Sequence, residues 1–275
     1  MKVRLLQMTQ SPIDIMWAAA RTCYSKRSPI EMWEEINRDG NKFNVLEMDK
    51  RWNLIEKILE SKHESICEHV NFTFAIEGIS RACLAQITRH RTGIVFSVMS
   101  QRYVEIKENY EKIRDLVVSI DSSSRYFNES TCKGKEQELI GILDKYFVNV
   151  NEDNIVGYGQ ALMQYLRATN RGKKAEDARN FLPNATKTNL VMTINLRELM
   201  HVSNLRLCTR AQLEIRRLFQ EIKKEVEKQE PHIAELLVPS CKANHGICSE
   251  HNSCGLSPTF EEVMSVYKGE YEDEI

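Results

Sequence analysis

The chain has 275 residues, 42% of them hydrophobic and 28% charged, with 38 Lys and Arg residues against 39 Asp and Glu residues. This is ordinary globular composition, and it excludes disordered, collagen-like and low-complexity proteins. The net charge of −1 gives no general attraction to nucleic acid, and no apolar run approaches the roughly 18 residues that a membrane-spanning helix needs, so we expect neither a nucleic-acid nor a membrane partner.

The N-terminal part of the chain mixes helix and strand patterns. Apolar residues at helical spacing predict helices over 13–24 and 49–60. Residues 69–78, HVNFTFAIEG, alternate between apolar and polar side chains and predict a strand. The serine that follows this strand is expected to cap a helix over 80–88. A second strand is expected to begin near Arg102, in the segment RYVEI.

The C-terminal part carries longer helical patterns. After a mixed stretch over 108–133 that includes a serine loop at 122–124, we expect one or two amphipathic helices over 134–171, a strand over 186–194, and helices over 195–208 and 211–229. Helices and strands are interspersed without regular alternation, which favours an α+β fold with a mainly antiparallel sheet flanked by helices. No clear linker divides the chain, so we expect a single domain over 1–275 with a tail from about residue 240.

The densest chemical cluster is Arg89-His90-Arg91, which is followed by an apolar stretch and then by Ser100-Gln101-Arg102. Three successive side chains cannot share one helix face, because each residue rotates by about 100° around the helix axis. A helix end suits them, and arginine offers a planar fork that matches phosphate. The cluster indicates either a phosphate-binding site or a solvated basic turn.

Two further segments are rich in polar side chains. His63 and His69 lie six residues apart, which is not the spacing of a helical zinc motif, so this segment indicates either an active-site wall or a polar corner between helix and strand. In the predicted helix over 195–208, Arg197 and Arg206 project about 180° apart. Such a helix serves two sites, or one site shared between subunits, whereas an ordinary amphipathic helix explains its leucines but not its polar residues.

Five motifs in order carry a family resemblance. EHVNFTF, TRHR, SQRYVE, ARNFLPNATKTNL and NLRELMHVSNLRLCTRAQLEIR resemble the flavin-dependent thymidylate synthase family in their order and spacing. The resemblance is continuous over 63–103 and 178–218, is weaker over 1–24, and says little about 108–172. It implies the fold of that family and the reductive methylation of dUMP to dTMP.

The resemblance also implies which residues form the site. For the nucleotide it implies Gln86, Arg89, Ser100, Gln101, Arg102, Arg179 and Arg206. For FAD it implies Asn71, Arg89, His90, Arg91, Asn195, Arg197 and His201. The implied catalytic residues are Arg206, which would polarise the uracil ring, His69, which would lie over the flavin, and Ser100. We interpret Ser100 as a binding residue more than a nucleophile, because no adjacent general base is evident.

The implied cycle uses methylenetetrahydrofolate as the carbon donor and FAD, reduced by NADPH, as the hydride carrier, in a homotetramer with active sites shared between subunits. The unrelated thymidylate synthases activate C6 of uracil with a cysteine, and no cysteine here has a comparable setting. The flavin is therefore expected to carry the difficult chemistry, while the protein supplies positions and charge.

Two departures from the family pattern favour alternatives. Eight residues, 92–99, separate the basic cluster from Ser100 where the family usually has seven, and Val98 replaces a polar residue. One alternative is a related flavin enzyme that modifies another pyrimidine nucleotide, such as a hydroxymethylase. Another is a non-catalytic nucleotide- or RNA-binding protein built on the basic cluster.

The tail concentrates thiols and imidazoles, at Cys241, His245, Cys248, His251 and Cys254. Such ligands suit Zn²⁺, but their spacing matches no known finger, and reduced cysteines in a folded loop are the alternative that we adopt, with no metal site. The first fourteen residues lack the apolar core of a signal peptide, so we expect a cytoplasmic protein with mostly reduced cysteines.

Overall fold

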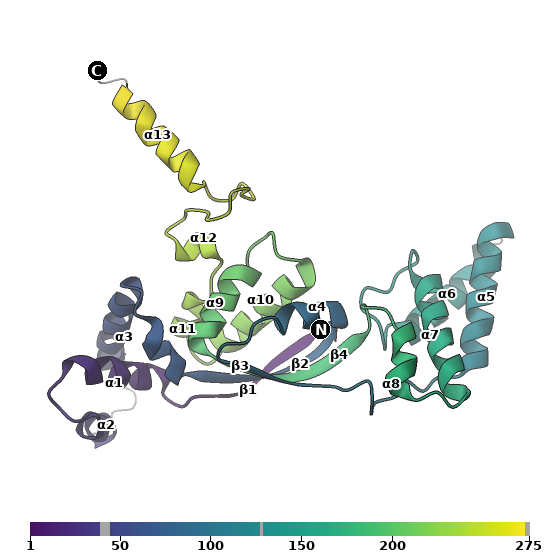
Figure 1. Ribbon diagram of the computed structural model, residues 1–275, viewed down its shortest axis with the longest axis horizontal. Coiled ribbons are helices and arrows are strands. Elements are labelled where there is room, and N and C mark those ends of the chain that lie inside the picture. The colour runs from purple at the N-terminus through teal and green to yellow at the C-terminus, as the bar shows by residue number, and fades with distance from the viewer. Residues whose placement is uncertain (39–44, 127–128, 273–275) are drawn as a thin grey trace. The chain divides into compact units, whose positions relative to one another are not determined.

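The computed structural model describes residues 1–38, 45–126 and 129–272. They form two compact units, each described by itself. The helical unit comprises Met1, Ile76–Arg89 and Ser97–Leu190, and the pocket unit comprises Lys2–Ala75, His90–Phe96 and Val191–Ile275. The helices (Figure 1) are α1 (Pro12–Tyr24), α2 (Pro29–Arg38), α3 (Val45–Glu60), α4 (Arg81–Ile87), α5 (Tyr110–Tyr126), α6 (Glu129–Leu143), α7 (Ile155–Asn170), α8 (Ala175–Ala178), α9 (Leu196–Arg206), α10 (Leu213–Glu227), α11 (Pro231–Leu236), α12 (Ser240–Ala243), α13 (Phe260–Glu272) and the 3-10 turns η1 (Glu64–His69) and η2 (Arg179–Phe181).

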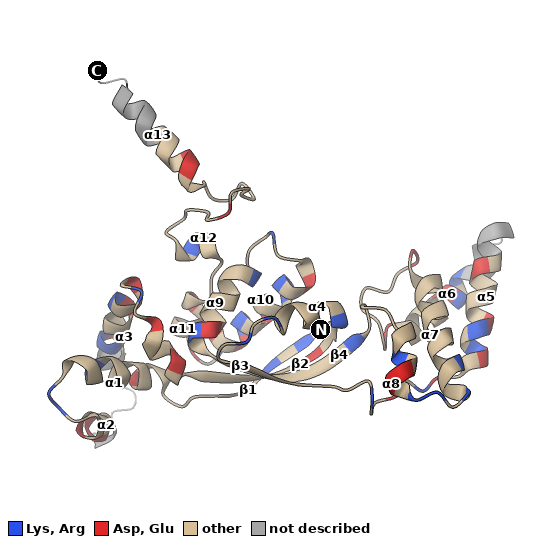
Figure 2. Ribbon diagram, in the orientation of Figure 1, with Lys and Arg blue, Asp and Glu red and all other residues tan. Residues whose placement is uncertain are grey.

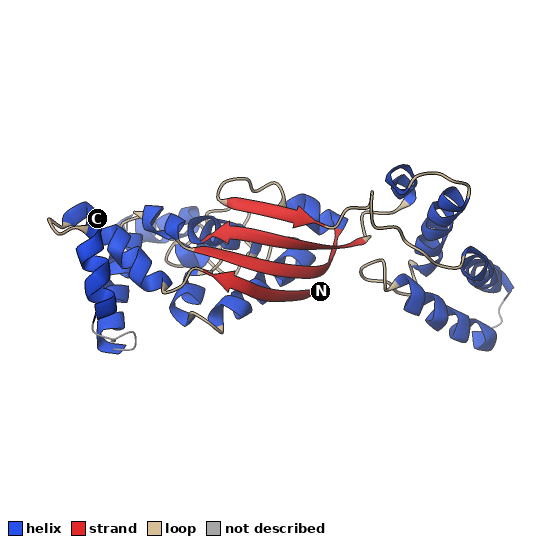
Figure 3. Cartoon of the chain, turned by 90° about the horizontal axis from the view of Figure 1, so that it is seen from below, coloured by secondary structure: helices blue, strands red, loops and turns tan. Residues whose placement is uncertain are grey.

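The four described strands form one sheet. They are β1 (Lys2–Met8), β2 (Asn71–Ser80), β3 (Ile94–Val98) and β4 (Lys187–Asn195), hydrogen-bonded in the order β1-β2-β4-β3. Figure 3 shows that the direction of the arrows alternates from strand to strand, so every neighbouring pair is antiparallel. The expected α+β fold with an antiparallel sheet is confirmed.

The central strands show why the sequence folds in this way. In β2, Phe72, Phe74 and Ile76 are fully buried, and in β4 Met192 and Ile194 are fully buried, while the residues between them are exposed or half-buried. This alternation gives the sheet one apolar face. In the pocket unit, α9, α10 and α11 lie on one side of the sheet (Figures 1 and 3), and α10 packs along β1.

The helices predicted from periodicity are largely confirmed. Those expected over 13–24, 49–60 and 80–88 correspond to α1, α3 and α4, and Ser80 caps α4 by accepting a hydrogen bond from the backbone N–H of Cys83 at 2.9 Å. Those expected over 195–208 and 211–229 correspond to α9 and α10. The strands expected over 69–78 and 186–194 are β2 and β4.

Two predictions between residues 102 and 133 are wrong. The strand expected from Arg102 is absent among the described residues, where 101–104 instead form a turn. The backbone N–H of Val104 donates to the Ser100 carbonyl at 3.0 Å, and the Ser100 hydroxyl accepts from the Arg102 N–H at 3.1 Å. These local bonds hold the chain in a turn, so the strand lies earlier, at β3.

The serine loop expected at 122–124 lies inside α5. Ile113, Leu116, Val117 and Ile120 of this helix are buried in a cluster that also contains apolar residues of α6 and α7. This packing outweighs the weak helix propensity of serine. The stretch 134–171 is confirmed as helical, in two helices separated by residues 144–154.

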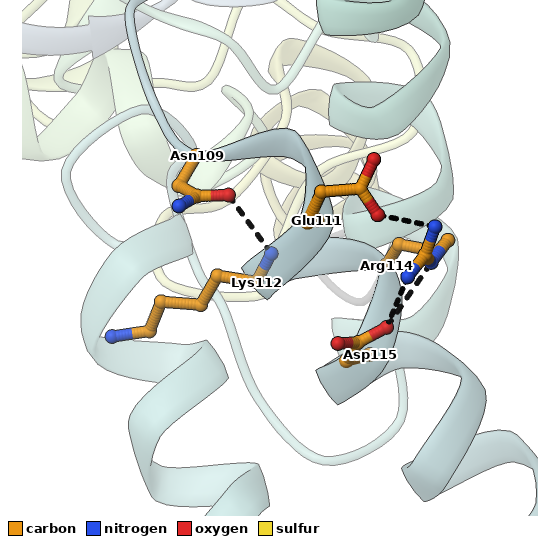
Figure 4. Close-up of polar contacts among 5 residues, drawn as sticks. All are labelled: Asn109, Glu111, Lys112, Arg114 and Asp115. Carbon is orange, nitrogen blue, oxygen red and sulfur yellow. Dashed lines mark hydrogen bonds and ion pairs between the residues drawn. The ribbon is translucent and has the colours of Figure 1, made fainter.

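The start of α5 is fixed by polar contacts (Figure 4). Asn109 accepts a hydrogen bond from the backbone N–H of Lys112 at 3.1 Å, as an N-cap does. Arg114 pairs with Glu111 and Asp115 on the same helix. Figure 2 shows that α5 carries residues of both signs, as expected for a helix with one solvated face.

Several elements were not predicted, among them β1, α2 and the helices after residue 230. Cysteines 23, 67, 83, 208, 241, 248 and 254 form no disulfide with one another, whereas the side chain of Cys132 lies outside the described residues. Within the described parts of the chain, no helix combines the length and apolar character needed to cross a bilayer.

The contact between α5 and α7 generates a first prediction. A Cβ on Gly159 of α7 would overlap a γ-methyl of Val117, whose β-branched side chain has little freedom to move. We expect Gly159→Ala to lower the free energy of unfolding by about 1–3 kcal/mol. Urea-induced unfolding followed by circular dichroism measures this loss.

Gly157 provides the matched control, because the same helix leaves open space around its Cβ position. Gly157→Ala should be neutral or should stabilise the protein by up to about 1 kcal/mol. Adding Val117→Ala to Gly159→Ala should recover part of the loss. An equal effect of the two single alanines would contradict the close packing of α5 against α7.

Candidate active site

Asn195 joins β4 to α9 in the pocket unit. Its side-chain oxygen accepts a hydrogen bond from the backbone N–H of Glu198 at 2.9 Å and so caps the helix, while its own backbone N–H donates to the Gly93 carbonyl at 2.8 Å. Gly93 has a φ of +65°, and a Cβ there would overlap the Asn195 side-chain amide. Glycine therefore permits the close approach that holds the first turn of α9 beside residues 90–93.

A cavity of about 620 Å³ lies at this first turn. Its lining residues come from η1, from the segment before β3 and from α9: Glu64, Glu68, Thr92, Gly93, Asn195, Arg197, Glu198 and His201. The volume falls within the range of roughly 300–1,000 Å³ that small-molecule and cofactor sites have. Three of the residues expected to bind FAD, Asn195, Arg197 and His201, are therefore brought together at one cavity.

Arg197 lies between two carboxylates of η1. Its Nη1 contacts Glu68, and its Nε lies 3.7 Å from a carboxylate oxygen of Glu64. The hydrogen bond that Arg197 donates to Glu68, together with the nearby negative charges, raises the pKa of Arg197 above its ordinary value. About half of the Arg197 side chain remains exposed, at 51%, so the guanidinium is oriented by η1 and still open to a ligand.

His90 is the part of the basic cluster that enters the structure most deeply. Its Nδ1 lies 3.5 Å from Oε1 of Glu198, and its Nε2 lies 3.2 Å from Nη2 of Arg206. Its ring also meets the ring of His201 edge-on, with centroids 6.2 Å apart. Burial raises the pKa of Glu198, and the nearby His201 opposes that rise. Arg206, expected to face the uracil, thus belongs to a network with the predicted flavin residue His90.

The helical unit contains a separate group of nucleotide-site candidates. Nε of Arg102 lies 2.8 Å from a carboxylate oxygen of Glu176 in α8. Arg179 follows three residues later, at the start of η2, and is exposed. The turn after β3 and the segment 176–179 therefore meet, which brings two of the predicted phosphate-side arginines into one region of this unit.

Arg81 is a candidate that the sequence reasoning missed. Its Nη2 donates to the Met99 carbonyl at 2.8 Å, immediately before Ser100, and its Nε is buried without a hydrogen-bond partner among the described residues. Burial lowers the pKa of Arg81, and the neighbouring charge of Arg179 lowers it further. Two nearby guanidinium groups repel each other, and an anion bound between them would relieve that repulsion. In the sequence, only the Ser-Arg pair at the start of α4 could have indicated Arg81 as a site residue.

The remaining predicted site residues lie on η1, β2, α4 and the segments that flank β3. His69 and Asn71 are exposed where η1 passes into β2, and the backbone of Asn71 is bonded to Thr9. Gln86 lies on α4 and Gln101 in the turn after β3, both half-buried. Arg89 and Arg91 are exposed on either side of His90. Of the eight residues before Ser100, five form β3, and Val98 is the last of them.

The thiols nearest these elements are poorly suited to act as nucleophiles. Cys67 in η1 is fully buried, and burial together with the charge of Glu64 raises its pKa to about 12. Cys83 in α4 is also fully buried. A thiolate, not a thiol, is the nucleophile, so a thiol with so high a pKa is unreactive near neutral pH.

The described thiols and imidazoles of the tail do not cluster into a possible metal site. Across residues 1–36, 48–122 and 133–266, whose side chains the structure describes, no three His, Cys, Asp or Glu side chains lie close enough to hold a metal ion. Arg210 instead holds the tail by donating hydrogen bonds to the Glu250 carboxylate, at 3.2 Å, and to the Asn252 carbonyl. Cys248 is paired with Thr259 in an isolated parallel bridge.

Comparisons with known proteins show which family the chain matches. Residues 4–232 match the family model described as thymidylate synthase complementing protein. The chain is 33% identical over 264 residues to a flavin-dependent thymidylate synthase of Clostridium tetani, covering 95% of this chain and 96% of that protein. It is 37% identical over 228 residues to one of Haloarcula marismortui, covering 81% and 89%.

The chain belongs to the flavin-dependent thymidylate synthase family. The family resemblance drawn from the motifs is thereby confirmed. Two crystal structures of the Helicobacter pylori enzyme with FAD and dUMP resemble the fold, with TM-scores of 0.62 and 0.56 at 23% and 26% identity. Each alignment covers 86% of this chain, and 100% and 99% of the other.

The close approach of Asn195 to Gly93 generates a second prediction. Gly93→Ala would place a methyl group against the capping side chain in a backbone conformation that L-residues avoid. We expect it to lower the free energy of unfolding by about 2–4 kcal/mol and to weaken ligand binding in the cavity. Thermal unfolding and cofactor titration measure the two effects.

Gly246 is the matched control in the pocket unit. It has a φ of +90° with open space at its Cβ position, so Gly246→Ala carries the backbone cost alone, about 1 kcal/mol. Losses of stability that are the same at both positions would show that the contact with Asn195 contributes nothing.

Proposed function

We propose that this chain catalyses the reductive methylation of dUMP to dTMP with FAD as its bound redox cofactor. The observation that carries the proposal is the convergence of His90, Asn195, Arg197, His201 and Arg206 around α9, in a chain of the flavin-dependent thymidylate synthase family. The Helicobacter pylori structures, which contain FAD and dUMP, support both ligands.

The lining of the cavity fits a flavin nucleotide. Arg197 provides a charge for the pyrophosphate, and Asn195 and His201 provide groups that can bond to its polar edges. The carboxylates of Glu64 and Glu68 are already engaged by Arg197, which limits their repulsion of an anionic ligand. When bound, FAD would supply the hydride that the transferred carbon must gain.

The residues of the chain would do the binding and the charge stabilisation. Arg206 would donate hydrogen bonds to a pyrimidine oxygen and stabilise the negative charge that develops there. Arg102, Arg179 and Arg81 would offset the charge of the nucleotide phosphate, with Ser100, Gln101, Gln86 and Arg89 as further contacts. His69, exposed at the end of η1, would lie where the folate approaches.

We also propose the remaining participants. Methylenetetrahydrofolate would donate the carbon and NADPH would provide the reducing equivalents. Arg197 and Arg206, both on α9, have different partners: Arg197 contacts the carboxylates of η1, and Arg206 contacts His90. This difference supports a homotetramer whose sites combine faces of this helix from different subunits. The free cysteines favour a cytoplasmic location.

Replacement of Arg206 tests the function. Arg206→Ala should retain FAD, identified by its absorbance, but should lose dUMP binding and about 2–4 kcal/mol of transition-state stabilisation in kcat/KM. The control is Arg217→Ala, on the exposed side of α10. Product analysis by mass spectrometry is the decisive measurement on the wild-type protein, since a product other than dTMP, or a colourless protein without FAD, refutes the proposal.

The thiols generate a further prediction. Because Cys67 and Cys83 are buried and the chemistry is assigned to the flavin, Cys67→Ala, Cys83→Ala and Cys208→Ser should each keep turnover within about tenfold of wild type. Circular dichroism checks that each variant is folded. Complete loss of turnover in a folded variant would argue for a thiol nucleophile.

A further inference from the structure

Glu198 carries a largely buried carboxylate to which neither the motifs nor the proposed mechanism gives a role. Its side chain is only 12% exposed, and its pKa is raised by burial. It stands three residues after the N-cap Asn195, where a glutamate often bonds back to the N-cap backbone N–H. Here that N–H is engaged by the Gly93 carbonyl at 2.8 Å, and the Glu198 carboxylate lies instead beside His90.

The contact between Arg206 and His90 fixes the direction of one hydrogen bond. An arginine side chain can only donate, so Nε2 of His90, 3.2 Å from Nη2 of Arg206, must accept. A neutral imidazole with an accepting Nε2 carries its proton on Nδ1. The acceptor beside Nδ1 is Glu198, whose Oε1 lies 3.5 Å away, slightly farther than in an ordinary N–H···O hydrogen bond.

We propose that Glu198 is a positioning residue that holds His90 in its Nδ1–H tautomer, so that Nε2 can accept from Arg206 and orient its guanidinium. This inference rests on the proposed function for its consequence, the binding of dUMP, but the tautomer itself is independent of that function. The His90 ring lies between the two groups, 3.5 Å from Glu198 and 3.2 Å from Arg206, and the His90 and Glu198 side chains are only 10% and 12% exposed, so water competes little for either nitrogen.

The proposal explains why a carboxylate stands beside a site for an anionic nucleotide. Without an acceptor at Nδ1, His90 would be free to carry its proton on Nε2, and two donors would then face each other across the contact with Arg206. Arg206 would turn away, and one orienting bond of the uracil-binding side chain would be lost. The charged or titratable groups of α9 that face His90 are Glu198, Arg206 and His201.

Solid-state ¹⁵N NMR of protein labelled only at its seven histidines tests the tautomer directly. Nitrogen shifts distinguish protonated from unprotonated ring positions, and His90→Gln identifies the signals of His90. In the wild type we expect a protonated Nδ1 and an unprotonated Nε2. A wild-type protein with a protonated Nε2 overturns the proposal without any variant being made.

Two substitutions separate orientation from charge and packing. Glu198→Ala should shift His90 to the Nε2–H form and raise the dissociation constant of dUMP about tenfold in calorimetric titrations of the flavin-loaded protein. Glu198→Gln keeps an acceptor oxygen and should preserve both the tautomer and most of the affinity. Glu221→Ala, which removes an exposed carboxylate paired with Lys224 on α10, is the control and should change neither.

The outcomes distinguish this inference from the proposed function. Loss of dUMP binding in both Glu198→Ala and Glu198→Gln, with the tautomer unchanged, would overturn the positioning role. Unchanged affinity in Glu198→Ala after a change of tautomer would also overturn it. A wild-type protein that shows the Nδ1–H tautomer but never binds dUMP would refute the proposed function and leave the assignment of the tautomer standing.

Discussion

The crossing of Asn195 over Gly93 is the constraint on which the rest of the pocket unit depends. Asn195 ends β4, caps α9 and hydrogen-bonds to Gly93 in the segment that leads into β3. Position 93 is a glycine because a larger residue would overlap the Asn195 side-chain amide. This junction fixes the start of α9 relative to the sheet. Every polar side chain on the first two turns of α9 is therefore placed relative to residues 90–93 by backbone bonds, which are less mobile than side-chain contacts.

The carboxylates of the cavity orient its basic side chains but would also repel an anionic ligand. Three glutamates line a space where an anion is expected, which by itself would weaken binding. Two of them hold Arg197 from one side, and the third faces a histidine, so each carboxylate has a cationic or donating neighbour. Holding the cations in place before a ligand arrives reduces the entropy that binding would otherwise lose.

Much of the fold follows from sequence periodicity, and the exceptions have physical reasons. β2 and β4 alternate clearly because one face is buried and the other is not. In β1, an edge strand, exposed and half-buried residues alternate from Lys2 but the alternation is broken at Leu6 and Gln7, which are both exposed. β3 has five residues, too few for a period to be recognised, and its partner lies about ninety positions later in the chain. The predicted site residues came from ordered motifs. Glu198 and Arg81 were missed because their significance lies in contacts with distant residues, His90 and Arg179, that no local pattern contains.

The buried cluster shared by α5, α6 and α7 has a consequence for how this family can vary. The cluster draws its members from Ile113 to Ala178, and none of them belongs to a strand. A change in the packing of these helices can be compensated among the helices themselves. The connection over 144–154 is different, because it is bonded to the start of β4: the backbone N–H of Lys187 donates to the Tyr146 carbonyl at 2.7 Å, and Phe147 pairs with Thr186. Substitutions within this cluster should therefore be compensated by other members of the cluster and not by residues of the sheet.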